Sequence, residues 1–342
     1  MFFENTTISY PVLLITSIKK GFEAFGRTIN KTGKIARWLL DKHLYHDQIA
    51  ILARKEFRKN KRIFLLFDDT LIKKIYSQLI EGSGRVYDTQ SMRRIMAHKL
   101  LVAMLSDGKQ TLPLTSTFLF SKELMPTPKE TKLDWIQRVI QMVQMMFSDA
   151  QIIVTADGAF SSKKFLGWCS EKNVAVEVRM RSNCVVQYQG EKVAIRNIKS
   201  LQPRGRQMAR TIAVTWYEIP LYITAQKRLD KHGNESVVYQ ASTSKAKPAE
   251  HVRIYRVRWN IERFFRTAKQ YLGLQECSSR KLEAQESHVA SVLLAYALVQ
   301  IDRKKQKLPS PESAINTAER KKGVPLKHYI DRLNRFFDIA IA

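Results

Sequence analysis

The chain has 342 residues, of which 44% are hydrophobic and 26% are charged, an ordinary composition for a folded protein. Its 58 Lys and Arg against 31 Asp and Glu give a formal net charge of +27, which indicates a polyanionic partner. DNA or RNA is favoured over a membrane surface, because no stretch has the roughly 18 uncharged apolar residues of a spanning helix. The N-terminus has no basic start or small-residue cleavage site, so we expect a cytoplasmic protein.

The first 60 residues are predicted to be a basic helical segment that contacts DNA. Apolar positions recur over residues 15–25 and 35–57 among many Lys and Arg. The run from Arg54 to Arg62 is interpreted either as a solvated helix face or as a phosphate-contacting arm.

Carboxylates follow a short apolar run. Residues 63–67 (IFLLF) have the pattern of a strand buried on both faces, which we expect to end at Asp68, Asp69 and Thr70. Residues 99–105 and 111–120 flank the turn signal Asp107-Gly108 and predict a hairpin.

The next elements alternate between helix and strand. We predict helices over 131–147 and 161–172, and strands over 152–155 and 174–180, with Asp157 just after the first of these strands. Three strands followed by helix, strand, helix and strand is the order of a ribonuclease H-like α/β fold, a mixed sheet flanked by helices.

The later part divides into an insertion and two long helices. Short alternating segments at 211–217, 221–224 and 237–240 predict a β-rich insertion, and helices are expected over 249–272 and 281–304. The predicted domains are a catalytic domain of residues 61–183 and 249–305, an insertion of 184–248, and a basic helical tail of 306–342.

One helix carries a motif of four polar residues. The spacing Y-x2-R-x3-E-x6-K is formed by Tyr255, Arg258, Glu262 and Lys269. On an ideal helix these side chains lie within about 60° of one another, so they share a narrow face. An amphipathic helix with i, i+4 ion pairs explains Arg258 and Glu262 but leaves the other two positions unexplained.

Three segments together resemble the DDE transposases of bacterial insertion sequences, in the cut-and-paste class with a YREK motif. They are FDDT at 67–70, VTADGAF at 154–160 and YRVRWNIERFFRTAKQYLGLQ at 255–275, and the resemblance covers roughly residues 60–305. It implies a metal-binding catalytic triad of Asp69, Asp157 and Glu262. Asp69 is preferred over Asp68 because the family's acid directly precedes a small polar residue, here Thr70, and Asp68 is kept as the substitute.

Clustered carboxylates repel one another unless cations neutralise them, and their hard oxygens suit Mg²⁺ or Mn²⁺, here two ions. The resemblance further implies that Tyr255, Arg258 and Lys269 hold DNA phosphates. A surface ion-pair network is the alternative for these three. In this family the insertion also stacks a flipped base on an aromatic ring, for which Trp216 is the candidate, although a core position is its alternative.

The implied reaction is phosphodiester hydrolysis and strand transfer at the ends of an insertion sequence. Its partners would be double-stranded DNA, as element ends and as target, and a second copy of the chain in a synaptic complex on the bacterial nucleoid. Two other functions stay open: a ribonuclease H-like nuclease that cuts without joining, and an inactive relic that only binds DNA.

Overall fold

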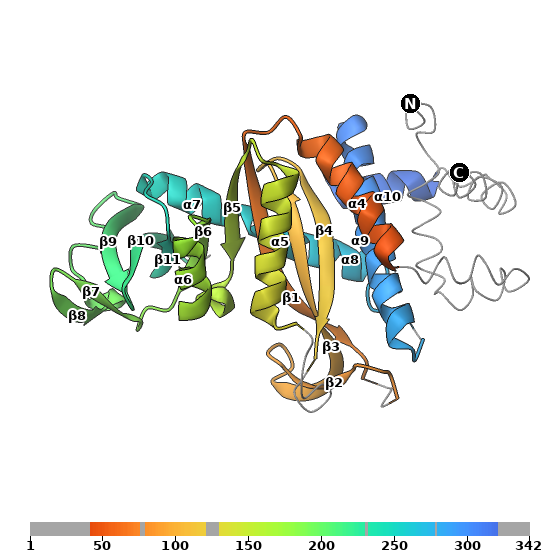
Figure 1. The fold of residues 1–342 in the computed structure, drawn as a ribbon, viewed down its shortest axis with the longest axis horizontal. Coiled ribbons are helices and arrows are strands. Elements are labelled where there is room, and N and C mark those ends of the chain that lie inside the picture. The colour runs from red at the N-terminus through yellow and green to blue at the C-terminus, as the bar shows by residue number, and fades with distance from the viewer. Residues whose placement is uncertain (1–41, 76–78, 121–129, 230–231, 278, 321–342) are drawn as a thin grey trace, which may run out of the picture.

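A computed structural model describes residues 42–75, 79–120, 130–229, 232–277 and 279–320. This part of the chain is a mixed α/β structure in which helices cover both faces of an eleven-stranded sheet (Figure 1). The strands are β1 (Arg62–Lys73), β2 (Gly84–Asp88), β3 (Arg93–Ser106), β4 (Thr111–Leu119), β5 (Gln151–Ala156), β6 (Ala175–Met180), β7 (Val185–Tyr188), β8 (Glu191–Ala194), β9 (Ala209–Trp216), β10 (Ile219–Leu229) and β11 (Glu235–Ser242). The helices are α4 (Lys42–Phe57), α5 (Lys132–Met146), α6 (Lys163–Glu171), α7 (Pro248–Val257), α8 (Trp259–Tyr271), α9 (Leu282–Lys305) and α10 (Pro311–Arg320).

The centre of the sheet confirms the predicted ribonuclease H-like fold class. Strands β1, β5 and β6 are parallel neighbours, and β3 and β4 continue the sheet antiparallel beyond β1. In Figure 1, α5 crosses the near face of these strands, while α7 and α8 run behind them. The predicted hairpin joins β3 to β4, where Asp107 accepts the backbone N–H groups of Lys109 and Gln110 and Gly108 has a positive φ of 89°.

Strand β1 is longer than its sequence pattern predicts. The apolar run 63–67 is fully buried, as expected, but pairing with β3 continues from Phe64 opposite Ser106 to Lys73 opposite Ala97. Asp68 and Asp69 therefore lie inside the strand, and the prediction that the strand ends at these acids is wrong. The hydrogen-bonded partner strand, which the local pattern does not reveal, sets the length of β1.

The strands of the predicted insertion extend the same sheet. Predicted segments 211–217, 221–224 and 237–240 correspond to β9, β10 and β11, whereas β2, β7 and β8 were not predicted. Strand β11 pairs antiparallel with β6, from Tyr239 opposite Met180 to Ser242 opposite Glu177. The strand order is β2-β3-β1-β5-β6-β11-β10-β9-β7-β8, with β4 paired to β3, so the insertion shares backbone hydrogen bonds with the central strands.

The long helix expected over residues 249–272 is two helices, α7 and α8, that meet at Arg258. The Arg258 N–H donates to the Tyr255 carbonyl at 3.1 Å, and the Ile261 N–H donates to the Arg258 carbonyl at 3.0 Å. These i to i−3 bonds tighten the chain locally and interrupt the α-helical ladder. Beyond the break, α8 buries its apolar side, where the Phe264 ring meets Tyr296 of α9 edge-on with centroids 4.9 Å apart.

The other helices anchor the ends of the described region. Helix α5 begins with a capping box in which Thr131 and Asp134 satisfy each other's backbone N–H groups. Helix α4 buries Ile49 and Phe57, and its Glu56 accepts a hydrogen bond from Lys304 of α9. The predicted helical stretch 15–25 lies outside the described residues. None of the described helices is long and apolar enough to cross a membrane.

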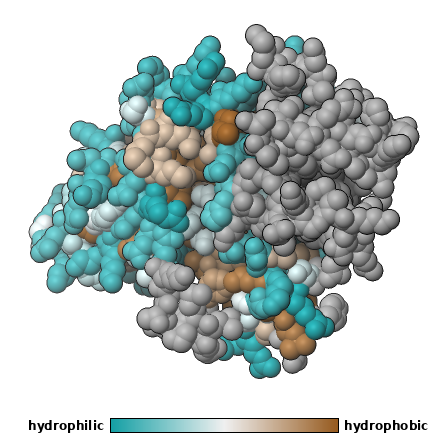
Figure 2. Space-filling model, turned by 45° about the vertical axis from the view of Figure 1, so that its right-hand side comes forward, coloured by the Kyte–Doolittle hydropathy of each residue, from teal (hydrophilic) through white to brown (hydrophobic). Residues whose placement is uncertain are grey.

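Hydrophilic residues cover much of the described surface on the face shown in Figure 2. Figure 2 shows them over most of the described part of one face, with small hydrophobic patches between them. This distribution agrees with the strongly basic composition.

Candidate active site

Neighbouring aspartates on β1 face opposite sides of the sheet. Side chains alternate along a strand, so Asp69 shares a side with Phe67, and Asp68 shares the other side with Thr70. On the α5 side, Asp69 Oδ2 lies 3.2 Å from Lys132 Nζ and 3.3 Å from Lys99 Nζ. On the α8 side, Asp68 Oδ2 lies 3.3 Å from Arg258 Nη1.

Asp157 follows β5, the strand next to β1, and belongs to the Asp68 side. Phe67 and Ala156 are partners in the parallel register, so Asp68 and Asp157 occupy the next positions along their strands. Asp157 caps a short 3₁₀ turn over Gly158–Phe160, where its Oδ1 accepts the Ala159 N–H at 2.8 Å. The cap fixes this carboxylate at the carboxyl end of β5.

Glu262 approaches from the first turn of α8. Its Oε1 accepts a hydrogen bond from Arg258 Nη2 at 2.5 Å, while Arg258 Nη1 donates to Asp68. The nearly buried Arg258 guanidinium thus lies between the carboxylates of β1 and α8. The interruption of the helix at Arg258 places this side chain at the centre of the acids.

The acids on the α8 side lie close together, and Arg258 is the cation that contacts two of them. Burial raises the pKa of Asp68 to about 7, Arg258 opposes this rise, and the negative charge of Asp157 adds to it. Burial acts to lower the pKa of Arg258, but Tyr255, Asp68 and Glu262 together raise it above its ordinary value. A further cation would therefore stabilise the ionised form of Asp68.

Tyr255 and Lys269 complete the polar face predicted from the motif spacing. Tyr255 is buried, and burial raises its pKa. Lys269 Nζ donates to Thr70 Oγ1 at 2.7 Å, and burial lowers the pKa of this lysine. The structure brings these two side chains to the same side of the sheet as Asp68, Asp157 and Glu262, and it places Asp69 on the opposite side.

The residues on the α8 side have the donor chemistry for a divalent cation. Asp68, Asp157 and Glu262 offer carboxylate oxygens, and the charge of Asp157 acts on a buried neighbour. In the described part of the chain, no three acidic, histidine or cysteine side chains already surround a common point suited to an ion. Arg258 occupies the space between Asp68 and Glu262.

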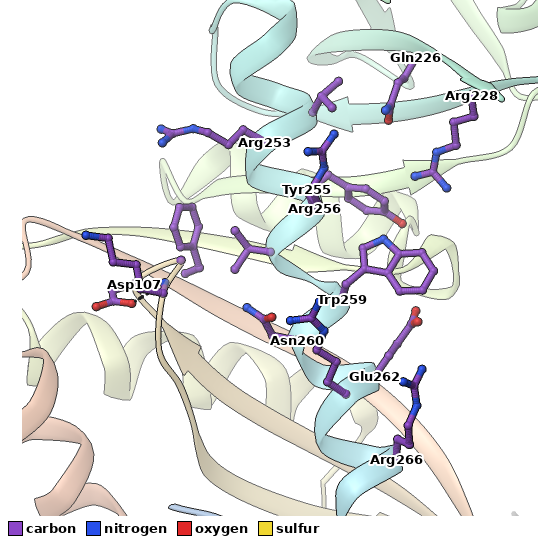
Figure 3. Close-up of a pocket in the computed structure, with 16 residues that line it drawn as sticks. Asp107, Gln226, Arg228, Arg253, Tyr255, Arg256, Trp259, Asn260, Glu262 and Arg266 are labelled. Atoms are coloured by element: carbon purple, nitrogen blue, oxygen red, sulfur yellow. Dashed lines mark hydrogen bonds between the residues drawn. The ribbon is translucent and has the colours of Figure 1, made fainter. Parts of the chain in front are cut away.

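A cavity of about 850 Å³ opens beside Glu262, between the hairpin turn at 107–109 and strand β10 (Figure 3). Trp259 lies in this cavity with 45% of its surface exposed, next to Tyr255 and Glu262. Trp216, the residue suggested for base stacking, is buried and contacts the ring of Tyr217. The core interpretation of Trp216 therefore agrees with the structure, and Trp259 is the accessible aromatic ring beside the acids.

Reasoning from the sequence missed two features of this site. The side on which Asp68 lies depends on β1 continuing past the acids, and strand alternation from Phe67 is the signal that separates the two aspartates. Trp259 stands inside the recognised motif, one residue after Arg258, but its exposure depends on the interruption between α7 and α8.

The fold and the site define a class of protein: a ribonuclease H-like domain with acidic residues from β1, β5 and α8 on one side of its sheet. Residues 133–298 match the family model described as "Transposase DDE domain", which supports a transposase role for the chain. The match includes Asp157 and Glu262 and begins after both aspartates of β1. The search of curated proteins finds no match.

Proposed function

We propose that the protein is a DNA transposase of the YREK class that cuts and joins the ends of a bacterial insertion sequence. The observation that carries this proposal is the convergence of Asp68, Asp157, Glu262 and the YREK side chains on one side of a ribonuclease H-like sheet. The match to the transposase DDE domain supports it independently of this geometry.

In this proposal Asp68 takes the place that the sequence assigned to Asp69. Asp68 shares Arg258 with Glu262 and senses the charge of Asp157, whereas Asp69 contacts Lys99 and Lys132 on the other side of the sheet. Asp68, Asp157 and Glu262 would hold Mg²⁺ or Mn²⁺. Bound divalent ions supply Lewis acidity that activates a water or a DNA 3′-hydroxyl and stabilises the departing oxygen.

The YREK side chains position DNA in this scheme. Arg258 carries two hydrogen bonds to carboxylates, so a guanidinium released from them is placed to bind a phosphate in bidentate fashion. Lys269 and Tyr255 flank it on the same helical face, and Trp259 offers a ring for stacking beside Glu262. A second copy of the chain would pair the two ends of the element.

The test uses duplex DNA that carries the inverted repeats flanking the gene, with Mn²⁺ as the metal. We expect the wild-type protein to nick the ends and to join them to a plasmid. Asp157→Asn and Glu262→Gln should abolish both products while DNA binding persists, because each change removes a ligand and no positive charge.

Glu171→Gln, an exposed acid on α6, is the matched control and should retain activity. Nicked ends without joined product in the wild-type protein would favour a nuclease that only cuts. Bound DNA with neither product would favour a protein that only occupies element ends.

A further inference from the structure

Three arginines lie on the exposed surface of α7 and α8, beside the YREK face. Arg263 and Arg266 are three residues apart on α8, and Arg256 precedes the break on α7. All three are exposed, and none forms an ion pair within the described residues. Arg253 differs, because Glu250 binds its guanidinium through two hydrogen bonds.

Two adjoining cavities follow this side of the helices. The cavity of about 850 Å³ beside Glu262 is continued by a second of about 470 Å³ that reaches α10. Both are lined by Lys109, Asn260, Arg263 and Arg266. We call Arg256, Arg263, Arg266 and Lys109 the arginine track. It forms one hollowed basic path along the helices.

The acids in these cavities leave most of this charge uncompensated. Asp107 is engaged by the backbone of its own turn, and Glu262 is bonded to Arg258. Glu312 accepts a hydrogen bond from Thr267, and the nearby charge of Arg266 helps to lower its pKa. An anion that enters the path would meet several arginines and few free carboxylates.

Positively charged side chains also lie close together at the end of the path nearest the insertion, around Arg228. Burial lowers the pKa of Arg228 on β10, and the positive charges of Arg179, Arg258 and Arg256 lower it further. Figure 3 shows Arg228, Arg256 and Arg266 around the same cavity as the exposed ring of Trp259. Repulsion among these groups is relieved by a polyanion such as a phosphodiester backbone.

The track adjoins the YREK face, because Arg266 lies one helical turn after Glu262 on α8. Arg258 and Lys269 point to β1, so a phosphate that they bind lies on the sheet side of the acids. Strand transfer brings a second DNA, the target, to the same acids. The exposed surface of α7 and α8 remains available for the backbone of this second DNA. Resting on the proposed function, we propose that the arginine track binds the backbone of the target duplex during strand transfer.

The experiment compares Arg263→Ala/Arg266→Ala with a control that removes the same charge outside both cavities, Arg138→Ala/Lys281→Ala. Both control side chains already bind glutamates, Arg138 to Glu130 and Lys281 to Glu81. Binding of a mixed-sequence 30-base-pair duplex is measured against salt concentration. We expect the slope of log K against log salt to fall by about two units in the track variant, since each phosphate contact contributes about 0.9.

The second measurement separates target from element end. Precut ends are offered with plasmid for joining, and uncut ends are offered for cleavage at saturating protein. The track variant should lose joining at least tenfold and keep cleavage within about twofold. Equal loss of both, or a slope change matched by the control, would overturn the proposal. If the wild-type protein binds DNA but joins nothing, both the proposed function and the assignment of the track to target DNA are wrong. The salt dependence of binding would still show whether the track contacts phosphates.

Discussion

The two adjacent aspartates of β1 lie on opposite sides of the sheet, in surroundings of opposite charge. On the α5 side, one acid, Asp69, lies between two lysines. On the α8 side, Asp68, Asp157 and Glu262 gather around Arg258, and Asp68 is buried enough for its pKa to reach about 7. On the first side two lysines already outweigh the one acid, whereas on the second side three acids surround one arginine. That difference marks the α8 side as the one suited to an added cation.

The largest expected effect separates the two aspartates directly. Asp68→Asn should reduce metal-dependent cleavage of element ends by at least about a thousandfold, because it removes a charged ligand while preserving side-chain shape. Asp69→Asn should stay within about tenfold of the wild-type rate. Single-turnover cleavage at saturating Mn²⁺ measures both, with DNA binding as the control. If Asp69→Asn is the inactive variant, the sides have been assigned the wrong way round.

A second prediction compares the cations of the two sides. Arg258→Gln leaves the partly buried acids without their counter-charge and should destabilise the metal-free protein by about 3 kcal/mol. Added Mn²⁺ should then raise its melting temperature more than it raises that of the wild-type protein, because the ion replaces the missing charge.

Lys132→Gln is the matched change on the α5 side, where Lys99 still neutralises Asp69. Its response to Mn²⁺ in calorimetry should equal that of the wild-type protein. An enhanced Mn²⁺ response in Lys132→Gln but not in Arg258→Gln would place the ion beside Asp69.

The smallest expected effect uses a second buried acid on the α7–α8 side, Glu177, whose Oε2 lies 2.8 Å from His251 Nδ1. Burial raises the pKa of Glu177 from 4.5 to about 7, although His251 opposes the rise. A raised pKa means that the folded state holds this proton more tightly. The resulting stability is fully present below pH 4.5 and is lost as pH rises through 7.

Glu177→Gln does not titrate, so the wild-type protein should lose stability relative to this variant between pH 5 and pH 8. The change should be a few degrees in Tm, since about 1 kcal/mol corresponds to roughly 2–4 °C in a domain of 150–250 residues and to somewhat less in a longer chain. Thermal unfolding at the two pH values measures it, with the exposed Glu171→Gln as reference. If Tm changes with pH equally in the wild-type protein and in Glu177→Gln, the pKa of Glu177 is not raised and the ionised carboxylate is tolerated at this buried position.

The sequence predicted those parts of the fold that depend on local pattern. The apolar run 63–67, the Asp107-Gly108 turn and the helical periodicity of 131–147 each act over a few neighbours, and each element lies where expected. The extent of β1, the break at Arg258 and the pairing of β11 with β6 depend on partners distant in the chain. The proposed assignment of Asp68 rather than Asp69 depends on the first of these, because a continued strand sends the two carboxylates to opposite sides.

The hydrogen bonds between β6 and β11 also fix the spacing between the central strands and the strands of the predicted insertion. Four strand-to-strand steps separate β1 from β10, which at about 4.8 Å each is a spacing of roughly 19 Å between these two strands. Asp68 lies on β1 and Arg228 on β10, and a continuous backbone ladder joins the two strands. In the proposed transposase, a DNA strand that contacts both side chains would therefore cross a separation that depends on the number of strands between them.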